Sequence, residues 1–142
     1  VGWGKYKAPY FPEKELKDFV GMAHNCVFMT AGFRRTIGLA GKGDVVYCDP
    51  PYEPLPGTSG FTAYSAGGFT WDNQVELVEC CVAAHRRGAS IVISNSVAPH
   101  VVDLYQQHGF SLNTIPARRS ISCKGSTREV AKDLVAVLEV VE

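Results

Sequence analysis

Two short apolar runs, each ending in polar residues, constrain the fold of this chain most strongly. Val45-Val46-Tyr47-Cys48 follows Asp44 and leads into Asp49, and Ser90-Ile91-Val92-Ile93-Ser94 leads into Asn95 and Ser96. Runs of this length, rich in β-branched residues, are typical of buried strands. Phe110 to Ala117 alternates like a further strand, and the apolar run Leu134 to Leu138 predicts a final one.

Helical patterns separate these strands. Pro12 and two nearby acids favour a helix that runs to about Asn25. Thr70 can cap a second helix to Arg87, whose apolar face is predicted to carry Trp71, Val75, Val78 and Val82. A short helix at 34–39, a helix from Pro99 to about Gly109 and a short strand at 26–30 complete the pattern. This alternation predicts an α/β fold, a mixed sheet with helices on both faces.

Composition excludes several classes of protein. The five cysteines show no Cys-x-x-Cys spacing, and the four histidines show no paired ligand spacing, so neither a disulfide framework nor a metal site is expected. No apolar run approaches the roughly 18 residues of a membrane span. No signal-peptide pattern opens the chain, so the expected location is cytoplasmic.

The zero net charge conceals a pattern. Residues 44–79 hold six acids and no Lys or Arg, whereas residues 118–128 hold four bases and no acid. Basic flanks of this kind can grip a phosphate backbone beside a neutral or acidic site. On charge alone, solvated faces explain the pattern better.

The sequence Asp49-Pro50-Pro51-Tyr52 stands at a predicted strand end, where open α/β sheets bind ligands. It suits a flat group that carries an amine. Asp49 can accept one hydrogen bond or a proton from the amine, and the carbonyl of Pro50 can accept a second hydrogen bond in a geometry that the proline rings stiffen. Tyr52 can stack on a nucleobase, which is worth about 1–3 kcal/mol per base. The alternative is structural: an acid that caps a turn, and an aromatic ring packed in the core.

A nucleobase inside a duplex hides its amine, so this chemistry requires the base to be flipped into a pocket. The long Gly-rich loop at 53–69 follows the motif, and loops of this length in compact domains are usually functional or mobile. Phe61 and Tyr64 in this loop could line such a pocket or hold the flanking strand.

Several blocks, in order and over nearly the whole chain, resemble the Dam-type (D12 class) DNA adenine-N6 methyltransferases. The blocks are Gly4 to Pro12, Asp44 to Tyr52, Phe61-Thr62-Ala63-Tyr64, Ile93-Ser94-Asn95 and Arg119-Ser120-Ile121-Ser122. The resemblance implies a Rossmann-like methyltransferase sheet. It also implies methyl transfer from S-adenosylmethionine to N6 of adenine in double-stranded DNA, usually in GATC, after base flipping.

The resemblance also implies roles for individual residues. Asp49 and Pro50 would bind the target amine, Tyr52 would stack on the flipped adenine, and Asp49 would lie near the methionine end of the cofactor. Lys5, Tyr6 and Lys7 match a stretch that meets DNA near the recognition hairpin, although plain surface lysines remain an alternative. Arg118, Arg119 and Lys124 belong to a loop that would lie against the phosphates.

Residues 1–12 are interpreted as the end of the target-recognition region, and residues 13–142 as the C-terminal part of the catalytic domain. Nothing here matches the glycine-rich cofactor loop, Phe-x-Gly-x-Gly, that the family places before its recognition region. The chain is therefore expected to lack that loop, to expose a sheet edge and to associate with itself. The nucleoid, through DNA, is the expected place of action.

Two alternatives remain open at this stage. One is methylation of another planar amine or amide, such as a protein glutamine or an RNA base; those enzymes commonly carry Asn where this chain has Asp49. The other is a non-catalytic DNA-contacting or truncated fragment, which the missing cofactor loop favours.

Overall fold

The computed structural model describes residues 10–55, 68–117 and 131–140 of the chain. These residues belong to two compact units, Val1–Ala31 and Gly32–Glu142. Each unit is described by itself.

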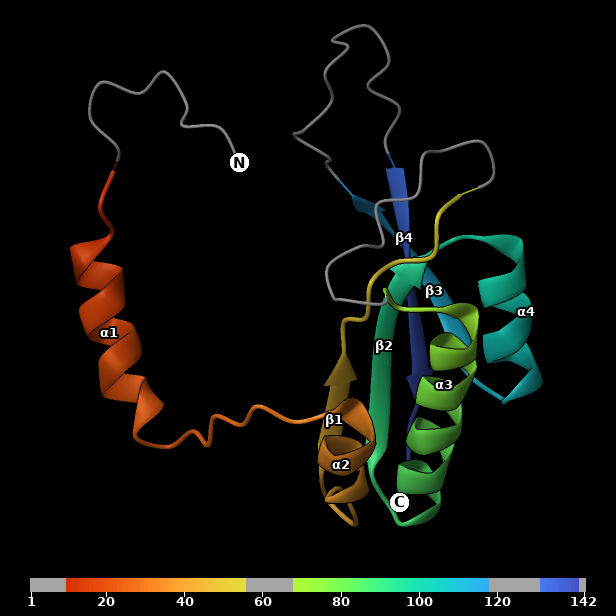
Figure 1. Ribbon diagram of the computed structural model, residues 1–142, viewed down its shortest axis with the longest axis horizontal. Helices are drawn as coiled ribbons and strands as arrows, with labels where there is room; N and C mark the ends of the chain where they lie inside the picture. The colour runs from red at the N-terminus through yellow and green to blue at the C-terminus, as the bar shows by residue number, and fades with distance from the viewer. Residues whose placement is uncertain (1–9, 56–67, 118–130, 141–142) are drawn as a thin grey trace, which may run out of the picture. The chain divides into compact units, whose positions relative to one another are not determined.

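The first unit contains helix α1 (Glu13–Ala23), which begins directly after Pro12, within two residues of the predicted bounds (Figure 1). The acids Glu13 and Glu15 lie in its first turn, where the helix dipole favours negative charge. No residue of α1 is buried, and its apolar side chains Leu16, Phe19 and Val20 are exposed.

The predicted strand at 26–30 does not form. Cys26 donates its backbone N–H to the carbonyl of Ala23 at 3.0 Å, in a turn that ends α1, and the residues after it have no regular structure. The apolar side chains Val27 and Phe28 are exposed, and the ring of Phe28 lies 6.2 Å from that of Phe19. The prediction was wrong because apolar content alone does not supply the neighbouring strand that a β-strand needs.

Among the described residues, the second unit is built on a sheet of four strands, which is mixed, as predicted (Figure 1). Its strands are β1 (Val45–Cys48), β2 (Ser90–Ser96), β3 (Ser111–Ala117) and β4 (Ala131–Leu138), in the order β1-β2-β4-β3. β1 and β2 are parallel, whereas β4 runs antiparallel to both β2 and β3. The carboxyl ends of β1 and β2 therefore meet at the same edge of the sheet.

Three helices complete this unit: α2 (Phe33–Gly38), α3 (Trp71–Arg86) and α4 (Pro99–Gln107). The hydroxyl oxygen of Thr70 accepts a hydrogen bond from the backbone of Asn73, and the Asn73 side chain accepts one from the Thr70 backbone, so the predicted cap of α3 is a reciprocal capping box. Pro99 occupies the first turn of α4, where its missing N–H costs nothing.

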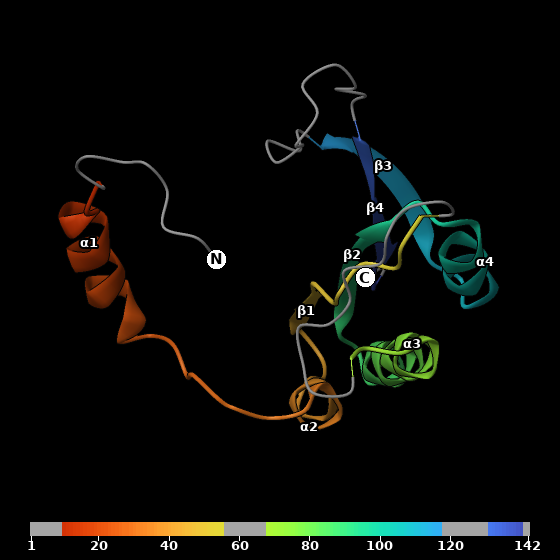
Figure 2. The ribbon, with the colours of Figure 1, turned by 45° about the horizontal axis from the view of Figure 1, so that its top comes forward.

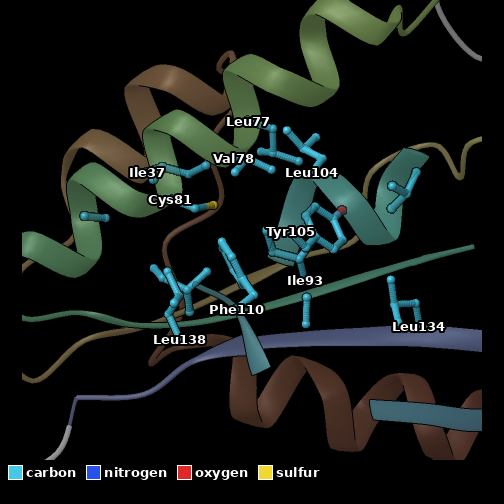
Figure 3. Close-up of a cluster of buried hydrophobic side chains, with 14 of the residues drawn as sticks. Ile37, Leu77, Val78, Cys81, Ile93, Leu104, Tyr105, Phe110, Leu134 and Leu138 are labelled. Atoms are coloured by element: carbon cyan, nitrogen blue, oxygen red, sulfur yellow. The ribbon is translucent and has the colours of Figure 1, made fainter. Parts of the chain in front are cut away.

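The core lies between the sheet and these three helices (Figure 3). The strands contribute Ile91, Ile93, Leu134, Ala136 and Leu138, which the register places on one face of the sheet. α3 contributes Leu77, Val78, Cys81 and Ala84, and α4 contributes Val101, Leu104 and Tyr105. The buried face of α3 thus differs from the predicted one: Val78 is buried, Trp71 is exposed, and Gln74 is buried at the start of the stripe.

All three helices of this unit lie on the same side of the sheet (Figure 2). On the opposite face, Val45 and Tyr47 are 73% and 65% exposed. Val92, Val135 and Val137 of that face are half-buried. The expected cover of helices on both faces is therefore not seen among the described residues of this unit.

Arg87 fastens α2 to the end of α3. Its guanidinium donates to the carbonyls of Ile37 at 3.1 Å, Ala40 at 3.0 Å and Ala83 at 3.0 Å, so it joins the end of α2 and the turn after it to the last turn of α3. Gly88 follows with a φ of 95°, and a Cβ there would meet Lys42 at 3.0 Å, so the turn into β2 needs glycine. No helix in the described parts of the chain is long and apolar enough to cross a bilayer.

Candidate active site at the ends of β1 and β2

The candidate site begins where β1 ends. Cys48 pairs with Ile93 in the parallel register, so Asp49 follows directly beside Ser94 of β2. The Ser94 hydroxyl donates to Asp49 Oδ1 at 2.7 Å and accepts a hydrogen bond from the Tyr47 hydroxyl at 3.2 Å. Ser94 is buried, whereas the Asp49 carboxylate is exposed. The hydrogen bond from Ser94 thus fixes one of the two carboxylate oxygens of Asp49.

Two hydrogen-bond acceptors of the motif are left available. Among residues 10–55, 68–117 and 131–140, neither Asp49 Oδ2 nor the carbonyl oxygen of Pro50 has a hydrogen-bond partner. The carbonyl sits between two proline-constrained residues, so its direction is restricted. A carboxylate oxygen and a fixed carbonyl oxygen on neighbouring residues can accept the two N–H groups of one amine.

The phenol of Tyr52 lies next to this pair of acceptors. Burial raises its pKa, a hydrogen bond with Ser94 opposes that rise, and the nearby carboxylates of Asp133 and Asp49 add to it. Tyr52 is half-buried and stays neutral at physiological pH, so it offers an uncharged aromatic ring beside the carboxylate. Asp133 comes from β4, opposite Ser96 in the register.

A buried pair of amides holds the backbone on both sides of Tyr52. Gln74 of α3 donates its Nε2 to the carbonyl of Pro51 at 2.9 Å, and Asn95 of β2 accepts the backbone N–H of Glu53 on Oδ1 at 3.0 Å. The two amides are themselves joined, because Asn95 Nδ2 donates to Gln74 Oε1 at 3.2 Å. Both side chains are at most 1% exposed.

Two further contacts fix Glu53. Ser96 Oγ donates to the Glu53 carbonyl at 2.6 Å, and Nε2 of His100 lies 3.2 Å from the Glu53 carboxylate. The His100 ring also packs edge-on against Trp71, with ring centroids 4.8 Å apart. The segment after the motif is therefore attached to β2, α3 and α4 together.

The structure places Asp49, Pro50 and Tyr52 at the end of β1, and the roles predicted for them stay predictions. The other eight predicted site residues lie outside the described residues: Lys5, Tyr6, Lys7, Phe61, Tyr64, Arg118, Arg119 and Lys124. Sequence reasoning missed Gln74, because a polar residue on an exposed-looking face of a helix gives no signal. It noted Asn95 and Ser96 as polar strand ends but could not assign their contacts. Within the described ranges, no group of three or more His, Cys, Asp or Glu side chains could hold a metal ion.

Comparison with known proteins agrees with the geometry. Residues 1–121 match the family model of the D12 class N6 adenine-specific DNA methyltransferases. The chain belongs to this family.

Relatives extend over almost the whole chain. The chain is 50% identical over 138 residues to a DNA N-6-adenine-methyltransferase of Escherichia phage P1. The alignment covers 97% of this chain and 18% of the phage protein. It is 41% identical over 138 residues to the DNA adenine methylase of Vibrio cholerae, covering 96% of this chain and 49% of that protein. The DNA adenine methylase of Escherichia coli K12 is 39% identical over 137 residues, with coverages of 96% and 49%.

The chain thus spans about half the length of the two methylases and 18% of the phage protein. Residues 1–121, which match the family model, contain the Asp-Pro-Pro-Tyr motif and the strands β1 and β2 that position it.

Proposed function

We propose that this chain holds the target amine in a DNA adenine-N6 methyltransferase. The observation that carries the proposal is the pair of free acceptors, Asp49 Oδ2 and the Pro50 carbonyl, beside the neutral ring of Tyr52. Membership of the D12 class supports adenine in double-stranded DNA as the substrate, and the resemblance makes GATC the expected target. A cytoplasmic location at the nucleoid belongs to the same proposal.

The amine of adenine is a weak nucleophile, because its lone pair is delocalised into the ring. In the proposed mechanism, Asp49 and the Pro50 carbonyl each accept one N–H of the amine, which increases electron density on nitrogen as it attacks. The base must leave the duplex to reach these acceptors. Tyr52 then stacks on the flipped base, at a gain of about 1–3 kcal/mol.

S-adenosylmethionine supplies the methyl group when bound. The described residues fit one part of it: the exposed Asp49 carboxylate, with an oxygen free of protein contacts in the described ranges, suits the ammonium at the methionine end.

The replacement Asp49→Ala tests this proposal in the full-length protein. Methyl transfer to a GATC duplex should fall by at least about 100-fold, because the amine loses its carboxylate acceptor. DNA affinity should change by less than about 3-fold, since Asp49 makes no phosphate contact in the proposal. Tritium transfer from labelled S-adenosylmethionine measures the first quantity, and fluorescence anisotropy measures the second.

The matched control is Asp44→Ala. Asp44 is an exposed acid just before β1, and among the described residues its carboxylate accepts only the N–H of Gly41, at 2.9 Å. This variant should transfer methyl groups like the wild type. Undiminished transfer by Asp49→Ala would overturn the proposal.

Calorimetric titration with S-adenosylmethionine separates the proposal from a purely DNA-contacting role. Binding by the full-length protein that weakens in Asp49→Ala agrees with the proposed enzyme. A full-length protein that binds DNA without binding S-adenosylmethionine would instead be a non-catalytic member of the family.

A further inference from the structure

The amide pair Gln74–Asn95 has a geometry that singles out one residue of the motif. Gln74 holds the carbonyl of the peptide group before Tyr52, and Asn95 holds the N–H of the peptide group after it. Two fixed peptide groups determine both backbone dihedrals of the residue between them. The pair therefore sets the direction in which the Tyr52 side chain leaves the backbone.

The pair is also rigid. Asn95 is 0% and Gln74 1% exposed, and every hydrogen-bonding group of the Asn95 amide is used. Its Oδ1 accepts from the backbone of Glu53 and of Ser96, and its Nδ2 donates to Gln74 Oε1 and to the Tyr105 hydroxyl at 3.0 Å. A fully satisfied polar network in a low-dielectric interior has a single preferred arrangement. None of the described buried side-chain polar atoms lacks a partner.

A core this close-packed could have been completed with apolar side chains at much lower desolvation cost. The two amides come from different elements, α3 and β2, and converge on a segment that belongs to neither. Their orientation toward the Tyr52 backbone is thus the feature that packing alone does not explain.

We propose that Gln74 and Asn95 are positioning residues for the methyl-transfer reaction: they hold the backbone of Tyr52 so that its ring and the Pro50 carbonyl face one flipped base. This inference rests on the proposed function. Its chemical consequence is that loss of the pair slows the reaction after DNA has bound, because the base is then held out of line with its acceptors. A misplacement of about 1 Å can cost about 100-fold in rate.

The decisive comparison is Gln74→Met against Tyr105→Phe in the full-length protein. Each removes one polar group from the same buried network, and each leaves a side chain of similar size. Of the two side chains, Gln74 bonds directly to the segment at Tyr52, whereas the Tyr105 hydroxyl, within the described residues, forms its hydrogen bond with Asn95. Both variants should unfold at a lower urea concentration than the wild type.

Their kinetics should differ. Gln74→Met should lower kcat by at least about 10-fold while KM for duplex DNA stays within about 3-fold, and Tyr105→Phe should keep both within about 3-fold. A duplex with 2-aminopurine at the target adenine reports the stacking of the flipped base, and its fluorescence should change in Gln74→Met alone. Equal kcat in the two variants, per folded molecule, would overturn the inference.

Gln74→Glu provides a second test if the methionine variant does not fold. A protonated carboxyl can donate to the Pro51 carbonyl and accept from Asn95, as the amide does, whereas a carboxylate cannot donate. The kcat of this variant, relative to the wild type, should therefore rise as the pH falls. A ratio that is independent of pH would contradict the positioning role.

Asp49→Ala, measured in the same assays, separates the two proposals. If that variant transfers methyl groups normally, the proposed function is wrong. If it is inactive while Gln74→Met keeps its kcat, only the positioning role is wrong.

Discussion

At the scale of single residues, the Asp-Pro-Pro-Tyr motif depends on a serine of the neighbouring strand, Ser94. Ser94 donates to Asp49 at 2.7 Å and accepts from the Tyr47 hydroxyl at 3.2 Å. One small hydroxyl therefore orients the carboxylate and joins it to the phenol of Tyr47. The remaining oxygen of Asp49 is directed outward as a result, which the sequence of the motif alone could not show.

We expect Ser94→Ala to lower kcat by about 10-fold, because Asp49 loses the hydrogen bond that orients it and the rate depends steeply on alignment. Stability should fall by about 1 kcal/mol, the usual cost of one lost hydrogen bond. Single-turnover methylation and urea unfolding measure the two effects.

Ser90→Ala is the matched control for that replacement. Ser90 begins the same strand, and in the described part of the chain its hydroxyl has one hydrogen bond, accepted from the N–H of Val140 at 3.4 Å. It should unfold much like the wild type and keep its kcat. A Ser94→Ala variant that methylates as fast as Ser90→Ala would show that Asp49 does not need this hydrogen bond.

At the scale of secondary structure, the sequence predicts most elements to within a few residues. It errs where the structure of a segment depends on contacts with another element. α3 and α4 begin where Thr70 and Pro99 place them, because capping is a local property. The region 26–30 has strand-like composition without a strand to pair with. On α3, the apolar residues Trp71 and Val82 indicated one face, but packing against β2 buries the stripe that begins at Gln74.

Packing of α4 on the sheet buries the Tyr105 hydroxyl, and burial raises its pKa to about 12. The unfolded chain loses this proton near pH 10, whereas the folded protein keeps it. The contribution of this group to the free energy of unfolding is therefore fully present below pH 10. It is lost as the pH rises from about 10 to about 12, by roughly 1.4 kcal/mol per pH unit.

Urea unfolding at pH 8, 10 and 11 checks this behaviour. At pH 8, the free energy of unfolding of the wild type should exceed that of Tyr105→Phe by about 1 kcal/mol. This difference should be smaller at pH 11. An advantage that stays constant across these pH values would mean that Tyr105 titrates in the folded protein as it does in the unfolded chain.

At the scale of the whole chain, the second unit has one covered sheet face and one face without a described helix. β1 lies at a sheet edge in the described order, and its Val45 side chain is 73% exposed. The other edge strand, β3, carries Pro116, which has no N–H to offer a further strand. The sequence could not reveal this asymmetry, because strand order and helix side depend on contacts between distant segments.

We expect the isolated 142-residue chain to associate through β1, since an open edge with exposed apolar side chains is a template for pairing. Val45→Lys should reduce this association, because a lysine at an edge opposes strand addition. Ile115→Lys, on β3, should have little effect. Sedimentation velocity measures the association, and a wild-type chain that sediments as a monomer at every concentration would contradict the expectation.

The buried amides also bear on how this protein could be engineered. Replacing both members of a buried hydrogen-bonded pair by apolar side chains of similar volume is often close to neutral for folding. Gln74 and Asn95 differ from such an isolated pair, because a chain with Leu at both places would leave the Pro51 carbonyl, the Glu53 N–H and the Tyr105 hydroxyl without these partners. Such a chain would keep its core and its Asp-Pro-Pro-Tyr sequence, yet nothing would hold the peptide groups around Tyr52. Thermostabilised versions should leave these two core positions untouched.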